Sequence, residues 1–342
     1  MARSKPDADS ASTRRSGRRH TLQALAALAA ASLGVGHAQT AAWPTRPIKL
    51  VLPSGAGGGA DIFARPMAEW MGKELGQTVV VDNKPGANGV IAHEAVVRQP
   101  GDGYNLVISF AAAVLGNKAL NAKIGHDTIT DLKPIGLIGG EGGNLLICNP
   151  ALPIQNLKDM LAYAKAQGAG LNYGSWGVGS GGHLVMETLR EKTGVSLNHV
   201  PYKTVAAIPP DVVSGTLGVS TIDAATPVAL IKAGRLRAIA ALSPARLPQL
   251  PDVPTMAEQG FPVGFIPWYG LFGPASLPAD MVQRLNALLN RWLVLPDTVA
   301  LFEQKQNSPA PKPKSADAFA AQIQAELPVW RQMMKTAKIE GA

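Results

Sequence analysis

The residues best suited to bind a ligand lie in a glycine-rich turn near the start of the chain. Residues 48–61 read IKLVLPSGAGGGAD, a strand pattern that leads into a glycine cluster and then into a helix pattern. Glycines let a ligand approach main-chain N–H groups closely, and the positive end of the following helix dipole favours an anion. We predict that an anionic ligand contacts this turn at Ser54, Gly55, Ala56, Gly57, Gly58, Gly59 and Asp61.

Two roles are open for Asp61. Its carboxylate could accept hydrogen bonds from a ligand amine. It could instead accept them from the amides of its own turn and offset the dipole of the helix that it begins. Both roles are compatible with the sequence.

A second glycine-rich turn lies in the middle of the chain. Residues 172–183 read NYGSWGVGSGGH, again a strand pattern, a glycine-rich loop and the start of a helix. Such a segment can be a plain connection, but ligands of open α/β sheets bind at the carboxyl ends of strands, where these turns lie. Two turns of this kind predict one ligand held between them. The residues expected from the second turn are Ser175, Gly177, Gly179, Ser180 and His183, with Ser180 also capping the helix.

The first turn also fits a dinucleotide-binding pattern. Residues 55–60 match G-x-G-x-x-A between a strand and a helix, and Asp82 ends the next predicted strand, as in the Rossmann arrangement. Against this interpretation, Pro53 and Ser54 separate the strand from the first glycine. A short pattern is also weak support in a glycine-rich stretch. An exported NAD(P)-dependent oxidoreductase is therefore the alternative to a binding protein.

Sequence signatures of catalysis and metal binding are missing. No serine stands in a G-x-S-x-G motif, and His93-Glu94 lacks the second histidine of HExxH. The single cysteine, Cys148, lies in an apolar run and is expected to be a buried strand residue. Neither a second cysteine nor a close histidine pair offers metal ligands. We predict that the protein is not an enzyme and needs no cofactor or metal.

Short apolar runs alternate along the chain with periodic segments of helix length. The strands and helices that they predict hold the two glycine-rich turns in place. Residues 48–52, 78–81 and 104–108 are predicted strands with helices between them, and the alternation restarts at residues 145–148. This pattern predicts βαβ units with largely parallel sheets.

The chain without its N-terminal segment, about 300 residues, is long enough for two separate cores. We predict two α/β domains, one formed by 43–142 plus 267–342 and the other by 143–266. Each glycine-rich turn then belongs to a different domain.

The N-terminus has the features of a secretory signal. Six Lys and Arg residues precede an uncharged run at 22–35, and small residues follow at Gly36 and Ala38. A membrane span needs about 20 apolar residues, more than this run provides. We predict that residues 1–38 form a signal peptide that is cleaved on export to the periplasm. Residues 17–22, GRRHTL, approach a twin-arginine signal, so both the general secretory and the twin-arginine routes are open.

The charge balance changes when this segment is removed. The full chain has 32 Lys and Arg against 24 Asp and Glu, and residues 1–38 hold six of the former and two of the latter. The remaining chain therefore has a small positive excess, a weak preference for anionic ligands. Because no Lys/Arg-rich block remains, we predict that the protein binds no nucleic acid.

Seven segments carry a family resemblance. They are WPTRPIKLVLP at 43–53, AGGGAD at 56–61, VVDNKPGANG at 80–89, PGDGY at 100–104, HVPYK at 199–203, IKAGRLRA at 231–238 and LPDVPT at 250–255. Together they resemble the receptors of tripartite tricarboxylate transporters, often called Bug proteins. The resemblance covers nearly all of residues 43–342 in the family's order, which is more specific than any single glycine motif.

The resemblance implies a periplasmic binding protein of the Venus-flytrap fold, with two α/β domains that each hold a mostly parallel sheet flanked by helices. It implies a receptor that captures a small organic acid, a carboxylate, between the domains for a two-component membrane permease. We expect the receptor to be a monomer. In the family, ligand contacts come from the two glycine-rich turns, from the turn after the third strand, here 109–117, and from the segment matching 221–224.

The chain departs from the family pattern at positions expected to face the ligand. In the family, the position of Ser54 usually holds an aromatic residue, that of Gly55 a proline and that of Ala60 a threonine. The family is usually polar where this chain has Ala111, Ala112 and Ala113. It usually has an acidic residue where this chain has Ile222, and Asp223 lies one residue later. The main-chain cradle is therefore expected to persist while side-chain donors are lost. We expect an apolar or aromatic monocarboxylate to fit the alanine-lined wall better than a C4 or C6 polycarboxylate.

Overall fold

The computed structural model describes residues 1–2, 43–120, 123–140, 144–224, 226–263, 267–306 and 312–339. Residues 46–342 form one compact unit, which holds all the helices and strands described. In residues 1–45, the described parts contain neither helix nor strand. The predicted signal peptide lies outside the described residues, apart from its first two. Within the described parts of the chain, no helix is long and apolar enough to span a membrane.

The first of two sheets has five strands in the order β2-β1-β3-β10-β4. These strands are β1 (Ile48–Leu52), β2 (Val79–Asn83), β3 (Asn105–Phe110), β4 (Leu132–Gly139) and β10 (Tyr269–Pro274). β1 pairs in parallel with β2 and β3, whereas β10 lies antiparallel between β3 and β4. All the strands except β10 therefore run in one direction.

The second sheet also has five strands, in the order β7-β6-β8-β5-β9. They are β5 (Asn144–Cys148), β6 (Leu171–Ser175), β7 (Leu197–Pro201), β8 (Val219–Asp223) and β9 (Arg237–Ala241). β6 pairs in parallel with β7 and β8, and β5 is antiparallel to both of its neighbours. Here too, one strand opposes the direction of the others.

The predicted fold class is confirmed, because two α/β sheets are flanked by helices and most strands of each sheet share one direction. β10 returns to the first sheet although every strand of the second sheet precedes it in the chain. The exact domain limits given above stay a prediction.

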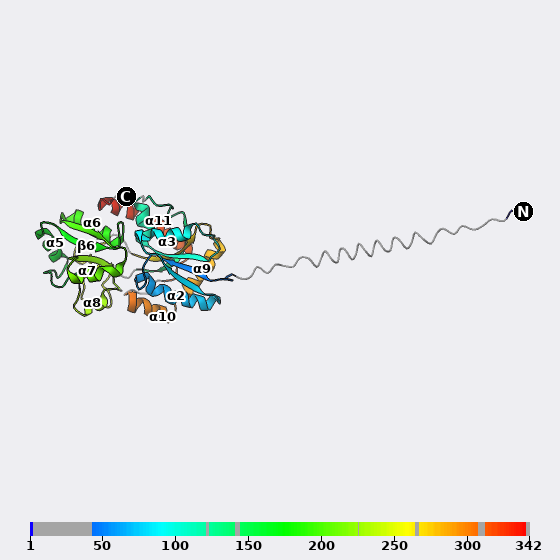
Figure 1. Cartoon of the computed structure of the whole chain (residues 1–342), viewed down its shortest axis with the longest axis horizontal. Helices are drawn as coiled ribbons and strands as arrows, with labels where there is room; N and C mark the ends of the chain where they lie inside the picture. The colour runs from blue at the N-terminus through cyan, green and yellow to red at the C-terminus, as the bar shows by residue number, and fades with distance from the viewer. Residues whose placement is uncertain are drawn as a thin grey trace. The chain divides into compact units, whose positions relative to one another are not determined.

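Helices cover both faces of the first sheet. They are α2 (Gly59–Leu75), α3 (Val90–Val97), α4 (Asn117–Ala119), α9 (Ala279–Leu293), α10 (Pro296–Leu301) and α11 (Ala316–Thr336). Three short segments join them: the 3-10 helix η1 (Ala87–Gly89) and the π-helical η2 (Ala112–Gly116) and η4 (Phe302–Gln306). Figure 1 shows α3 and α11 on one side of this sheet and α2 and α10 on the other. α11 stacks Phe319, Ile323, Leu327, Trp330 and Met334 into a core cluster that also contains Leu184 of the second half.

The second sheet is covered in the same way by α5 (Leu157–Ala166), α6 (Gly181–Thr193), α7 (Ile208–Ser214), α8 (Val228–Lys232) and the short turn η3 (Val205–Ala207). α5 and α6 bury apolar residues in one cluster, and α7 and α8 in another. Figure 1 shows α6 on one side of the strands around β6 and α7 and α8 on the other. Each sheet thus leaves the turns at its strand ends free to form a site.

Candidate functional site

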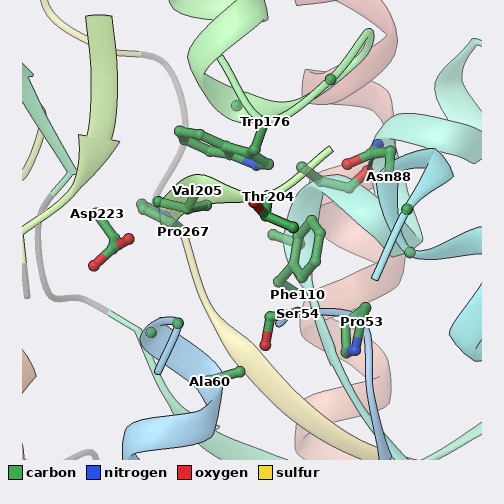
Figure 2. A pocket seen from close by; sticks show the side chains of 18 of the residues that line it. Pro53, Ser54, Ala60, Asn88, Phe110, Trp176, Thr204, Val205, Asp223 and Pro267 are labelled. Carbon is green, nitrogen blue, oxygen red and sulfur yellow. Dashed lines mark hydrogen bonds between the residues drawn. The ribbon is translucent and has the colours of Figure 1, made fainter. Parts of the chain in front are cut away.

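A cavity of about 600 Å³ lies among the turns of the two sheets. The first sheet contributes the β1–α2 turn, the segment before α3 and the turn after β3. The second sheet contributes the β6–α6 turn, the stretch after β7 and the end of β8. Both predicted glycine-rich turns therefore border one cavity. Figure 2 shows Trp176 and Phe110 facing this space, with Ser54, Asn88 and Asp223 around it.

The first glycine-rich turn is closed by main-chain hydrogen bonds. The Gly58 N–H donates to the Gly55 carbonyl over 3.1 Å, and Gly58 is the N-cap of α2. Gly57 has a φ of 76°, a conformation that favours glycine, and it does not line the cavity. The other predicted residues up to the first residue of α2 do line it: Ser54, Gly55, Ala56, Gly58 and Gly59.

Asp61 in the first turn of α2 holds this loop in place. Its carboxylate accepts hydrogen bonds from the Gly57 N–H (3.0 Å), Arg65 Nε (2.8 Å) and Asn83 Nδ2 (3.1 Å). Burial by itself would raise the pKa of Asp61, but these hydrogen bonds outweigh it and lower the pKa below its ordinary value. The residue is 5% exposed and does not line the cavity. Asp61 therefore binds the amides of its own turn, the second of the two roles open from the sequence.

The turn after β3 supplies an apolar wall. Phe110, Ala111 and Ala112 line the cavity, whereas Ala113 is fully buried and does not. A Cβ added at Gly89 would lie 2.7 Å from the Cβ of Ala113, so Ala113 packs against the segment that precedes α3.

That segment has an unusual backbone. Gly86, Ala87, Asn88 and Gly89 have consecutive positive φ angles of 122°, 46°, 46° and 87°. Left-handed conformations cost free energy in residues that carry side chains, and such strain often occurs at functional sites. All four residues line the cavity.

The second glycine-rich turn presents only part of itself to the cavity. Trp176, Gly177 and Val178 line it, and Gly181 lines it at the start of α6. The other predicted residues of this turn, Ser175, Gly179, Ser180 and His183, do not line it.

These four residues instead form a buried support for the turn. Ser180 Oγ accepts from the His183 N–H (3.2 Å), as predicted for an N-cap, and donates to Ser175 Oγ (3.2 Å). Ser175 Oγ lies 2.6 Å from His199 Nε2, and the Gly179 N–H donates to His183 Nδ1 over 3.1 Å. The network fixes the loop conformation that carries Trp176 into the cavity wall.

Burial lowers the pKa values of both histidines in this network, His183 and His199. Burial, followed by the charge of Arg190, lowers the pKa of His183 to about 4. Burial, followed by the neighbouring His183, lowers the pKa of His199 to about 4. Ser175 and His199 have the atoms of a nucleophile and a base, but Ser175 is fully buried and cannot reach a molecule in the cavity.

Asp223 ends β8 and faces the N-terminus of α2 from the other sheet. Thr226 donates to Asp223 Oδ1 from its N–H and from its hydroxyl, each over 3.0 Å. A Cβ added at Gly59 would lie 3.7 Å from Asp223 Cγ and 2.9 Å from Tyr269 Oη. Burial, followed by the Asp223 charge, raises the pKa of Tyr269. The Asp223 carboxylate therefore lies on the border of the cavity, near the positive end of α2.

Several lining residues were not among the predicted site residues: Asn88, Lys123, Lys203, Thr204, Val205 and Tyr269. Phe110 and Trp176 also line the cavity, and they lie in segments already expected to contact the ligand. Trp176 stands inside the second turn, and Asn88 and Lys203 stand in segments that carry the family resemblance. Those positions could have been found. Thr204 and Tyr269 had no local signal. Contact between any of the predicted residues and a ligand stays a prediction.

Cys148 is fully buried in β5, as predicted, and burial raises its pKa to about 11. Among the described residues, no group of three or more His, Cys, Asp or Glu side chains is placed to hold a metal ion.

Two α/β sheets with a cavity among their turns are the arrangement of a solute-binding receptor. The family of tripartite tricarboxylate transporter receptors matches residues 63–339. The chain belongs to this family, and the resemblance seen in the sequence is confirmed. A relative in the same family, Protein BugT of Bordetella pertussis, is 32% identical over 270 residues, which cover 78% of this chain and 82% of BugT.

Solved structures agree with this assignment. Rpa4515 of R. palustris, determined with adipate, is 30% identical with a TM-score of 0.81 and covers 88% of this chain and 100% of its own. The periplasmic binding protein BugD is also 30% identical, with a TM-score of 0.77 and coverage of 88% and 100%. The protein is thus an extracytoplasmic receptor and not an enzyme, and the oxidoreductase alternative has no support.

Proposed function

We propose that this receptor captures a small organic carboxylate between its two α/β domains, 43–142 plus 267–342 and 143–266, for a two-component membrane permease. The observation that carries the proposal is the single cavity bordered by both glycine-rich turns. The adipate bound by the similar Rpa4515 supports a carboxylate as the ligand class. We further propose that the receptor works as a monomer in the periplasm after loss of residues 1–38.

The carboxylate would be held by main-chain donors and positive charge. Ser54, Gly55 and Ala56 of the first turn and Gly181 at the start of α6 line the cavity, near the positive ends of two helices. Lys123 and Lys203 also line it and are exposed, so they add positive charge at the border. Both features favour an anion over a neutral solute.

The body of the ligand would be apolar. Phe110, Ala111, Ala112, Trp176 and Val178 line the cavity with carbon surface. A second carboxylate placed against these side chains would lose its hydration without gaining hydrogen bonds, which is costly. We therefore propose an apolar or aromatic monocarboxylate rather than a C4 or C6 polycarboxylate.

Ligand release would require the two sheets to separate. They approach each other at Gly59 and Asp223, and also where a Cβ at Gly179 would lie 2.6 Å from Leu120 Cδ1. A ligand that touches both sides stabilises the closed form over the open one, and this population difference would be read by the permease.

A thermal-shift screen tests the proposal, because a ligand that binds only the folded state raises the melting temperature. The screen would hold mono-, di- and tricarboxylates, aromatic acids and neutral amides. We expect aromatic or apolar monocarboxylates to give the largest shifts. Citrate or malate scoring far above them would refute the proposed ligand shape, and a response to no carboxylate at all would refute the function.

The variant Gly58→Val tests whether the first glycine-rich turn binds the ligand. A Cβ at this position would lie 3.2 Å from the Gly55 carbonyl oxygen and 3.5 Å from Ser54 Cβ, so the Gly55 backbone must shift to make room. We expect at least about tenfold weaker binding, equivalent to about 1.4 kcal/mol. Gly168→Ala is the control, because a Cβ there would meet nothing within 4 Å. Unchanged affinity in Gly58→Val would show that the first turn does not bind the ligand.

A further inference from the structure

Asn88 holds a buried hydrogen-bond acceptor at the wall of the cavity. Its Nδ2 donates to the Ala112 carbonyl (3.0 Å) and to Asn117 Oδ1 (3.3 Å). These two acceptors fix the amide orientation, because a flipped amide would set oxygen against oxygen. Asn88 Oδ1 therefore faces the other way, and it has no hydrogen-bond partner among the residues that the structure describes.

The position of this acceptor is rigid and buried. Asn88 is 9% exposed and lines the cavity, and Figure 2 shows its side chain on the cavity wall with the amide oxygen toward the interior. Asn117 Nδ2 donates to the Asn88 carbonyl (3.1 Å) and to the Ala113 carbonyl (2.8 Å). These bonds hold the left-handed backbone of Asn88, so the acceptor is set in place before a ligand arrives.

Ser54 adds a second polar atom on the neighbouring turn. Its Oγ is buried, and within the described parts of the chain it has no hydrogen-bond partner. Ser54 also lines the cavity, in a different segment from Asn88. A buried polar atom without a partner costs free energy, so two such atoms on one cavity indicate that the ligand completes them.

We propose, resting on the function proposed above, that Asn88 determines specificity by accepting a hydrogen bond from a hydroxyl group of the ligand. The ligand class is then a hydroxylated carboxylate with an apolar body. An ionised carboxylate is acceptor-only and cannot pair with Asn88 Oδ1. A ligand that lacks a donor leaves this acceptor buried and unpaired, and a site built to bind a hydroxyl discriminates against such a ligand.

A hydroxyl fits the surroundings better than an ammonium group does. Asn88 is neutral, and Lys123 and Lys203 add positive charge to the lining. The carboxylate that could attract an ammonium, Asp223, lies across the cavity from Asn88 in Figure 2. Thr226 already donates twice to that carboxylate.

Matched pairs of acids test the proposal by calorimetry on the exported protein. The pairs are benzoate with 3- and 4-hydroxybenzoate, phenylacetate with mandelate, and 3-phenylpropanoate with 3-phenyllactate. In at least one pair we expect the hydroxylated acid to bind about tenfold tighter or more. Asn88→Gly should reduce that ratio to about one by weakening the hydroxylated acid, since glycine keeps the left-handed backbone and removes only the amide.

Lys338→Gly is the control, because it relieves the same kind of left-handed backbone strain at a residue that does not line the cavity, and it should keep the preference. A ratio near one in every pair would overturn the role of Asn88 while leaving carboxylate binding intact. A preference that survives in Asn88→Gly would also overturn it. If 4-aminobenzoate or phenylglycine binds more tightly than its hydroxyl counterpart, the group that donates to Asn88 is an amine, which contradicts the proposal. Failure of all the carboxylates to bind would overturn the proposed function as well.

Discussion

The rings of His183 and His199 stack beneath the second glycine-rich turn, with centroids 3.9 Å apart and planes 15° from parallel. His183 Nδ1 accepts the Gly179 N–H, so this nitrogen must be unprotonated for the turn to keep its conformation. Two stacked rings in a buried site also disfavour a positive charge on either one. The turn that carries Trp176 therefore depends on neutral histidines.

Acid is expected to destabilise the protein through this pair. The folded pKa values of His183 and His199 are about 4, below the ordinary 6.5, so the unfolded chain binds more protons between these values. The free energy of unfolding should fall as the pH falls from about 6.5 to about 4, at up to about 1.4 kcal/mol per pH unit for each histidine. Above about pH 7 the two should contribute no slope. Melting temperatures measured across this range test the expectation.

The matched variant is His183→Asn, whose Oδ1 can replace Nδ1 as acceptor but does not titrate. We expect a shallower loss of stability in acid and a smaller acid-induced loss of ligand affinity. An unchanged pH dependence in this variant would assign the acid sensitivity to other groups.

Asp61→Asn should chiefly reduce stability. In Asp61, one carboxylate oxygen accepts from the Gly57 N–H and Arg65, and the other accepts from Asn83. The asparagine amide has only one oxygen, and its nitrogen is a donor, so it cannot accept all three hydrogen bonds. We expect the free energy of unfolding to fall by about 1–3 kcal/mol, measured by urea denaturation. A sharp loss of ligand affinity with native stability would instead show that Asp61 binds a ligand amine.

Trp176→Ala should weaken binding of aromatic acids about tenfold or more, because a large apolar contact surface is lost from the cavity wall. Tryptophan fluorescence and calorimetry measure the effect, and the fluorescence response to ligand should become smaller without Trp176, since Trp268 also lines the cavity. Trp70→Ala on α2, whose ring contacts Arg291, is the control and should keep the affinity. Equal losses in the two variants would contradict a ligand contact for Trp176.

Gly59→Ala should weaken binding by displacing Tyr269 at the border of the cavity. Its Cβ would lie 2.9 Å from Tyr269 Oη, so that hydroxyl must shift, whereas the 3.7 Å to Asp223 Cγ is an ordinary contact. We expect a severalfold loss of ligand affinity with little change in the free energy of unfolding, since alanine also favours the helix by about 0.5–1 kcal/mol. Affinity equal to that of Gly168→Ala would show that ligand binding does not depend on the position of Tyr269.

Export should remove residues 1–38. Intact-mass analysis of the periplasmic protein is expected to give a chain that begins at or near Gln39. Replacing Arg18 and Arg19 by lysines separates the two export routes, because the twin-arginine route needs the pair. Recovery of the full-length chain in membranes would contradict the predicted localisation.

The sequence by itself determined the two glycine-rich turns and the elements around them. A strand pattern, a glycine cluster and a helix start are local features, so residues 54–59 could be placed at the mouth of a sheet without knowledge of the rest. The same reasoning did not identify β4, whose residues include Pro134 and Gly136 and lack a clear strand pattern. It also could not show that β10 pairs between β3 and β4, because pairing between distant segments leaves no local signal.

Only the tertiary structure decided which side chains face the cavity. In the second turn, Trp176 lines the cavity while Ser175 and His183 turn inward, because His199 lies beneath them and offers a hydrogen bond and a stacking partner. The Asp61 carboxylate accepts hydrogen bonds from Gly57, Arg65 and Asn83, and the last two of these residues lie outside the turn. Backbone conformation is set largely by neighbours along the chain, whereas the direction of a side chain depends on what distant segments place against it.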